Sequence, residues 1–154
     1  MATSELRKIH ILANLTDEQL AALATFGEIV AVAAGQKIIS QGERADAMFM
    51  LISGRVAAFA KGKDGNESHL RNTEAGGHFG EIGLLEEGVR TASVRAESEC
   101  RVFCLKKDSF RAILKQPVLA TPLLYSLSRS LALRLADITN RLSEARSLKD
   151  AWHL

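Results

Sequence analysis

Cysteine and long hydrophobic segments are scarce in this sequence. Only two of the 154 residues are cysteine, and a chain of this length can bury a core without disulfides. Cys100 and Cys104 are four residues apart, which places both on one face of a strand, and we interpret them as free, buried thiols in a reducing compartment. No apolar run exceeds about six residues, whereas a membrane span needs about 18, and no signal peptide is visible. These absences indicate a cytoplasmic protein without a membrane segment.

Residues that could build a metal or catalytic centre are also few. The spacing of metal ligands is absent from the four histidines, His10, His69, His78 and His153. No Ser-His-Asp, Cys-His or paired-carboxylate arrangement is present either. A metal-dependent enzyme on a β-barrel would need several His and Glu ligands at one mouth, and only His69 and His78 lie among the predicted strands. We therefore expect no metal site, no catalytic residue and no enzymatic activity.

The remaining composition is that of an ordinary globular domain, with 47% hydrophobic and 25% charged residues. The net charge is only +2, but residues 101–154 hold ten Lys or Arg against four Asp or Glu. A basic segment of this kind can attract nucleic acid. Because acidic residues are interspersed along a predicted helix, we interpret the charge as a solvated helix face.

Three segments are distinguished by their sequence patterns. Residues 1–27 predict short helices: Thr16 and Gln19 have the spacing of a capping box, which indicates a helix ending near Phe26–Gly27, and residues 5–13 suggest a further helical piece. Residues 28–107 hold short apolar runs separated by glycine-rich turns, which is typical of a sandwich or rolled barrel. The expected strands are Ile29–Ala33, Lys37–Ser40, Met48–Ser53, Arg55–Ala60, Arg90–Ala96 and Cys100–Lys106, with a hairpin tip at Lys63–Asn66.

Residues 108–154 return to a helical period. Asp108 is the expected N-cap of a helix that runs through Lys115, where Gln116-Pro117 stops it. Thr121-Pro122 then predicts the start of a second helix, about 37 Å long, that ends near Arg146. One continuous apolar seam follows that helix: Leu124, Leu127, Leu131, Leu135, Ile138, Leu142 and Ala145. We expect the first half of the seam to lie on the barrel and the second half to meet a partner helix.

The stretch from Gly77 to Val94 carries the functional chemistry. Gly77 and Gly80 allow the backbone to approach a ligand closely, and Ile82–Leu85 could form a helical turn whose free N–H groups point toward Gly80. Arg90 suits a phosphate, which a guanidinium can bind with two hydrogen bonds. A carboxylate such as Glu81 beside an anion site needs its own donor, and a ribose hydroxyl would supply one. By themselves these residues fit many phosphorylated sugars.

The composite pattern has a known counterpart. Phe79–Leu85 followed by Arg90–Val94 resembles the phosphate-binding cassette of the cyclic-nucleotide-binding domain. That family includes bacterial catabolite activator proteins, protein kinase A regulatory subunits and cyclic-nucleotide-gated channels. The resemblance covers roughly residues 10–145. It implies an α+β fold: a double-stranded β-helix (jelly-roll) barrel with short N-terminal helices, a cassette helix and two C-terminal helices.

The resemblance also implies roles for individual residues. Arg90 would bind the exocyclic phosphate oxygens and Glu81 would accept a hydrogen bond from the ribose 2′-hydroxyl. Backbone amides around four residues would complete the anion site: Gly80, Ile82, Gly83 and Ala92. A proline that often precedes the arginine in the family is Val89 here.

The contacts to the base are less defined. Thr91 leaves the choice between cAMP and cGMP open, because binders of both nucleotides carry a hydroxyl at its position. Leu70 is a candidate apolar wall for the purine, or a simple core residue. Thr139 and Asn140, late on the final helix, are candidates for contacts to the base edge.

The expected function is therefore that of a non-enzymatic cyclic-nucleotide sensor without a bound cofactor. Its C-terminal helix would report ligand occupancy and could form a homodimer. Ser147–Leu154 are too few residues for a helix-turn-helix domain, so we expect no direct DNA binding by this chain. Two alternatives stay open: an excised sensor of a larger transcription regulator, and an interaction module of the same fold without a ligand. The downstream partner is not indicated.

Overall fold

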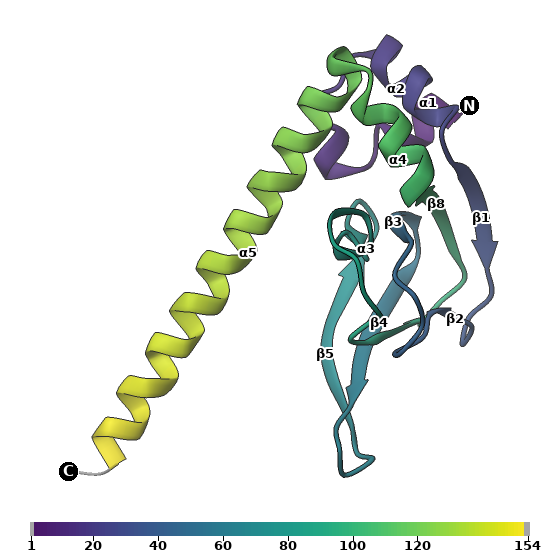
Figure 1. Ribbon diagram of the computed structural model, residues 1–154. Helices are drawn as coiled ribbons and strands as arrows, with labels where there is room; N and C mark the ends of the chain where they lie inside the picture. The colour runs from purple at the N-terminus through teal and green to yellow at the C-terminus, as the bar shows by residue number, and fades with distance from the viewer. Residues whose placement is uncertain (1, 153–154) are drawn as a thin grey trace.

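Two antiparallel four-stranded sheets form the centre of the molecule, and a long helix leaves it at one end (Figure 1). The computed structural model describes residues 2–152, so Met1, His153 and Leu154 lie outside the description. In chain order the elements are α1 (Ala2–Leu6), the 3-10 turn η1 (His10–Leu12), α2 (Asp17–Ala24), β1 (Glu28–Val32), β2 (Lys37–Ile39), β3 (Ala47–Ser53), β4 (Arg55–Lys61), β5 (Glu67–Glu74), β6 (His78–Phe79), α3 (Ile82–Leu85), β7 (Ser93–Ala96), β8 (Cys100–Lys106), α4 (Lys107–Leu114) and α5 (Pro117–Trp152).

The two sheets pack face to face. One has the strand order β1-β8-β3-β6 and the other β2-β7-β4-β5. Apolar side chains from both sheets form a common core: Val32, Ile39, Leu51, Val56, Phe79, Val94, Ala96, Cys100 and Val102. Side chains that alternate between a buried and an exposed face give such a sandwich its core. The predicted α+β jelly-roll with flanking helices is confirmed, and both cysteines are free thiols, Cys100 buried and Cys104 partly so.

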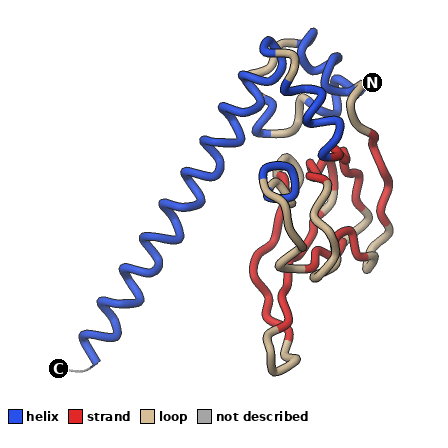
Figure 2. The backbone as a smooth tube through the Cα atoms, in the orientation of Figure 1, coloured by secondary structure: helices blue, strands red, loops and turns tan. Residues whose placement is uncertain are grey.

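The helices gather at one end of the sheets, with α1, α2, α4 and the start of α5 close together (Figure 2). A second apolar core holds them there, and its buried members include Leu6, Leu20, Leu23, Met48, Leu84, Phe110, Ile113, Leu123 and Leu127. Leu84 belongs to α3, the short helix between β6 and β7. The helical core therefore contacts the region in which the sequence predicts ligand chemistry.

The N-terminal predictions hold in part. The capping box is confirmed, because Thr16 Oγ1 accepts from the Gln19 amide at 3.1 Å and Gln19 Oε1 accepts from the Thr16 amide at 2.8 Å. The helix ends at Ala24 with Thr25 as its C-cap, slightly earlier than expected. The expectation of one helical piece over residues 5–13 is wrong, because that region is divided between α1 and η1.

The predicted start of the long helix at Pro122 is wrong. Pro117 is the first residue of α5, a position at which the missing N–H of proline is unneeded, and Pro122 lies inside the helix. Pro122 cannot donate to the Val118 carbonyl four residues earlier. The side chain of Gln19 in α2 donates to that carbonyl instead, at 2.9 Å. A contact about 100 residues away in the sequence therefore lets the helix continue through the proline.

Other boundaries also differ from the prediction, and α5 ends at Trp152 rather than near Arg146. Helix α4 begins at Lys107, and its N-cap is Lys106 rather than Asp108. Strand β7 begins at Ser93 rather than at Arg90, because the Arg90 amide donates to the Glu43 carbonyl at 2.7 Å and not to a sheet neighbour. Residues 90–92 thus belong to the loop that follows α3.

Helix α5 has a covered half and an open half. Leu119, Ala120, Leu123 and Leu127 are buried. Of the first seam residues, Leu127 is buried and Leu124 and Leu131 are partly buried. Further along, α5 diverges from β4 and β5 (Figure 1), and the side chains of the seam are exposed: Leu135 by 65%, Ile138 by 51% and Leu142 by 62%. None of the helices in residues 2–152 is both long enough and apolar enough to cross a membrane.

Candidate functional site

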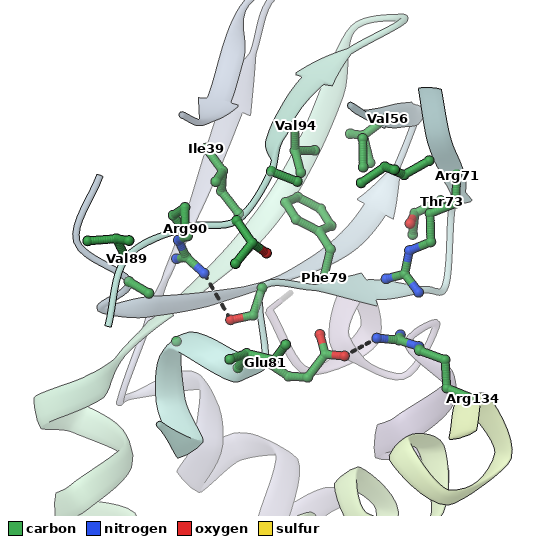
Figure 3. A pocket seen from close by; sticks show the side chains of 18 residues that line it. Ile39, Val56, Arg71, Thr73, Phe79, Glu81, Val89, Arg90, Val94 and Arg134 are labelled. Atoms are coloured by element: carbon green, nitrogen blue, oxygen red, sulfur yellow. Dashed lines mark hydrogen bonds and ion pairs between the residues drawn. The ribbon is translucent and has the colours of Figure 1, made fainter. Parts of the chain in front are cut away.

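A cavity of ≈ 260 Å³ lies between the β2-β7-β4-β5 sheet, the segment around α3 and helix α5. Its walls are largely apolar, with Ile39, Val56, Phe79 and Val94 on one side (Figure 3). The charged side chains at the cavity are three arginines and one carboxylate: Arg71, Arg90, Arg134 and Glu81. The arrangement offers an apolar surface and a net positive charge, which suits a partly apolar anion.

Arg90 is held by backbone oxygens. Its Nη2 donates to the Ala47 carbonyl at 2.6 Å and its Nη1 donates to the Gly80 carbonyl at 3.2 Å. Within residues 2–152, no carboxylate forms an ion pair with it. Burial lowers the pKa of Arg90, and the nearby Asp46 carboxylate offsets part of this effect, but a guanidinium stays charged in proteins. Arg90 thus presents a partly buried positive charge without a protein counter-ion.

Two glycines make room for this arginine. Gly80 has φ of +79°, a conformation that favours glycine. A Cβ added at Gly83 would lie 2.8 Å from Arg90 Nη1 and 3.0 Å from the Ala47 oxygen. Because real Cβ atoms do not approach so closely, any larger residue at Gly83 would displace the guanidinium.

The backbone amides near Arg90 are not all available. The Gly83 amide donates to the Gly80 carbonyl at 3.0 Å, which closes the turn before α3. In the described part of the chain, the amides of Ile82 and Ala92 donate to no protein acceptor. Of the amides that the sequence suggested, these two are therefore free for an anion and that of Gly83 is engaged.

Glu81 is only 2% exposed, and its carboxylate points away from Arg90 and toward Arg134 (Figure 3). Its carboxylate forms an ion pair with Arg134 of α5. Arg134 is the α5 residue that lines the cavity. The sequence did not predict this position, because an arginine three residues after Leu131 looks like any other polar residue on an exposed helix face. Only the approach of α5 to the sheet identifies it. The ion pair links the cavity directly to the long helix.

These features match a known family. Residues 29–117 match the family profile described as "Cyclic nucleotide-binding domain", which is more than half of the chain. The chain belongs to the cyclic nucleotide-binding domain family.

Individual relatives agree with this assignment. The chain is 34% identical over 109 residues to a cAMP-dependent protein kinase regulatory subunit of Emericella nidulans, a match that covers 71% of this chain and 26% of that protein. It is 36% identical over 107 residues to the cAMP-activated global transcriptional regulator CRP of Pasteurella multocida, covering 69% of this chain and 50% of that protein. The chain thus spans between about a quarter and a half of the length of these curated relatives.

A solved structure supports the fold. The crystal structure of the N-terminal domain of a transcriptional regulator from Streptomyces coelicolor has 29% sequence identity and a TM-score of 0.73, and the similarity covers 84% of this chain and 94% of that domain. The regulatory, cyclic nucleotide-binding character of the family agrees with the function expected from the cassette residues.

Most of the expected site residues of this cyclic nucleotide-binding domain meet at the cavity. Its lining includes Leu70, Gly80, Glu81, Ile82, Gly83, Arg90, Thr91 and Ala92. Leu70 is 54% exposed and is not a core residue. In the pairing of β4 with β5, Ala58 lies opposite Arg71 and Phe59 opposite His69, so Leu70 is an extra residue on its strand. This β-bulge interrupts the alternation of side chains and brings both Leu70 and Arg71 to the cavity.

Thr139 and Asn140 lie elsewhere. Neither lines the cavity, both are exposed, and Thr139 Oγ1 donates to the Leu135 carbonyl of its own helix at 2.8 Å. They follow Arg134 on the part of α5 that diverges from the sheet. The structure therefore does not bring these two residues to the position expected for contacts to a base.

His78 is a buried histidine that contacts α5. It is buried on β6, and its Nε2 lies 3.3 Å from Ser130 Oγ of α5. Burial lowers the pKa of His78, while the Glu81 carboxylate counteracts part of the shift and the Arg134 and Arg71 guanidinium groups add to it. Among residues 2–152, no group of three His, Cys, Asp or Glu could hold a metal ion, so the contact of His78 with α5 is its clearest role.

We predict that this histidine makes the domain less stable in acid. Below about pH 6.5 the unfolded chain binds a proton at His78 that the folded chain resists, so the free energy of unfolding falls as the pH decreases through this range. Urea unfolding of the wild type and His78→Gln between pH 7.5 and 5 measures this, with the exposed His69→Gln as control. An equal pH dependence in all three proteins would contradict the prediction.

Proposed function

We propose that this domain is a cyclic-nucleotide sensor that changes the position of α5 when the cavity is occupied, and that it catalyses no reaction. One observation carries the proposal: the partly buried guanidinium of Arg90 has no carboxylate partner and lies in the same cavity as the buried carboxylate of Glu81. A cyclic nucleotide offers one anionic phosphate and one ribose hydroxyl close together. It would therefore satisfy both groups.

The geometry suggests how the nucleotide would bind. The phosphate would take hydrogen bonds from Arg90 and from the free amides of Ile82 and Ala92. The ribose 2′-hydroxyl would donate to Glu81. The base would then lie toward the exposed side chain of Leu70 at the bulge of β5. The family of the chain, and the names of the two relatives described above, support a cyclic nucleotide as the ligand.

The choice of base depends on the polar groups beyond Glu81. Arg71 and Arg134 line this end of the cavity, and a guanidinium can only donate hydrogen bonds. Guanine presents two acceptors, O6 and N7, on its edge, whereas adenine replaces O6 by an amino donor. We therefore infer a preference for cGMP over cAMP. Both curated relatives described above are named for cAMP, so this preference tests the residues of this chain and not the resemblance.

The ion pair between Glu81 and Arg134 provides a route from the ligand to α5. A hydroxyl that donates to Glu81 would share the carboxylate with Arg134, whose Nη1 donates to Glu81 Oε1, and would thereby alter the strength of this ion pair. The ligand can shift α5 only to the extent that it binds one helix position more tightly than the other. Occupancy of the cavity and the position of α5 are thereby linked.

Replacing Arg90 tests the proposed phosphate contact. Arg90→Ala should weaken nucleotide binding by roughly thirty-fold to several thousand-fold, equivalent to about 2–5 kcal/mol, because the phosphate would lose the guanidinium proposed to bind it. Calorimetric titration with cAMP and with cGMP measures this, and the wild type should bind cGMP more tightly. Arg95→Ala is the control, because Arg95 lies on neighbouring β7 and contacts Phe59 and Glu67 instead of the cavity.

The titration also distinguishes the alternatives. If the wild type releases no heat and shows no thermal shift with either nucleotide, the domain is an interaction module without a ligand. If Arg90→Ala binds as tightly as Arg95→Ala, the phosphate does not depend on this arginine and the proposed site is wrong. Tighter binding of cAMP would leave the site intact but contradict the role given to Arg71 and Arg134.

We also propose that a second copy of the chain covers the open half of α5. Three exposed apolar side chains, Leu135, Ile138 and Leu142, follow each other at helical spacing and point to a helix–helix contact. Ile138→Lys should shift the protein from dimer to monomer in sedimentation velocity. Ser143→Lys adds the same charge away from the seam and should not. A wild type that sediments as a monomer at tens of micromolar would overturn this part of the proposal.

The setting of the sensor is also a proposal. Two free thiols fit a reducing compartment, so we place the protein in the cytoplasm. The curated relatives are longer proteins whose names include a kinase subunit and a transcriptional regulator. We propose that this domain likewise acts on an output outside residues 1–154, either in a partner or in a larger regulator, and that it does not contact DNA itself.

A further inference from the structure

Lys107, at the junction of β8 and α4, is a buried lysine outside the cavity. It is only 8% exposed, and lysine is almost never buried without partners. Its amide donates to the Asp46 carbonyl at 2.8 Å. Its Nζ donates to the Glu86 carbonyl at 2.9 Å and lies 3.1 Å from the Glu87 carboxylate. Three contacts therefore fix this residue between the sheet and the loop that follows α3.

The acceptors of Lys107 belong to the ligand-binding segment. Glu86 is the C-cap of α3. Glu87 is also bound by Arg111, one turn further along α4, at 3.0 Å. The hydrogen bond from Lys107 lowers the pKa of Glu87. Lys107 and Arg111 of α4 thus hold the loop that leads to Arg90.

Packing joins the same two elements. Leu84 of α3 and Phe110 and Ile113 of α4 belong to one buried cluster. In turn, α4 connects to α5 through only Lys115 and Gln116, and the first buried residues of α5 belong to that cluster too. Any displacement of the loop after α3 must either move α4 with it or break the contacts of Lys107.

We propose that Lys107 is a positioning residue that clamps the loop after α3 to α4, so that this loop and the C-terminal helices move as one body when the cavity is occupied. The role of this clamp in signalling rests on the proposed function, whereas the contacts of Lys107 do not. Moving the loop away would leave a buried ammonium group without its acceptors, which is strongly unfavourable. Moving the loop and α4 together keeps both contacts of Lys107 Nζ.

The clamp differs from the route through Arg134. Arg134 lies in the cavity and would sense the ribose through Glu81. Lys107 does not line the cavity and would transmit the position of the loop. Replacement of Lys107 should therefore separate binding from its consequence in the helices.

Hydrogen–deuterium exchange of the full chain tests the clamp. Without nucleotide, Lys107→Met should speed exchange of the amides in residues 86–92 by about ten-fold or more, because it removes hydrogen bonds to a charged donor. Glu87→Gln, which keeps the bond of Lys107 to the Glu86 carbonyl, should have a smaller effect in the same direction. Asp108→Asn is the matched control, because its exposed carboxylate also contacts Arg111, at 3.4 Å, but not Lys107.

With saturating cGMP, the wild type and Asp108→Asn should gain protection both in residues 86–92 and in α4. In Lys107→Met the nucleotide should protect the loop but not α4, while calorimetry should show a dissociation constant within about three-fold of the wild type. Equal exchange of the loop in Lys107→Met and Asp108→Asn, or full protection of α4 by nucleotide in Lys107→Met, would overturn the proposal.

A failure of the proposed function can be distinguished from a failure of the clamp. If the wild type binds no nucleotide, the proposed function fails, and the nucleotide-free exchange still decides whether Lys107 holds the loop. If Lys107→Met does not fold, Glu87→Gln carries both measurements, and a loop and an α4 that behave as in the wild type would then contradict the clamp.

Discussion

The site depends on one positive charge that the protein buries and does not neutralise. Arg90 donates to the carbonyls of Ala47 and Gly80, which are dipoles and not charges, and glycine at position 83 leaves space for its guanidinium. Placing a charge in such surroundings is unfavourable unless a counter-ion completes them. The surrounding loop, with its free amides and apolar walls, forms an environment that a bound anion would complete.

Two contacts connect the surroundings of this charge to the C-terminal helices. Glu81 follows the same loop and is paired with Arg134 of α5, while the loop after α3 is held to α4 by Lys107. In the proposed function, the first contact would respond to the ligand itself and the second to the position of the loop. Because α4 leads directly into α5, both contacts converge on one element whose far half is exposed.

Local sequence patterns predicted the elements whose chemistry is local. Gly80, Glu81 and Arg90 lie within about ten residues, so their spacing alone predicted that they share one candidate site, and they line one cavity. The capping box of Thr16 and Gln19 was predicted for the same reason. Contacts between distant residues could not be predicted. Pro122 is tolerated inside α5 because of Gln19, and Arg134 reaches the cavity because of the direction of α5. That same direction takes Thr139 and Asn140 away from it.

A crystal structure of the domain with a bound cyclic nucleotide tests the central claim most directly. The account predicts that the phosphate oxygens lie about 2.7–2.9 Å from the guanidinium nitrogens of Arg90, with the ribose hydroxyl on Glu81. A nucleotide whose phosphate lies elsewhere in the cavity, while Arg90 still donates only to the carbonyls of Ala47 and Gly80, would contradict it.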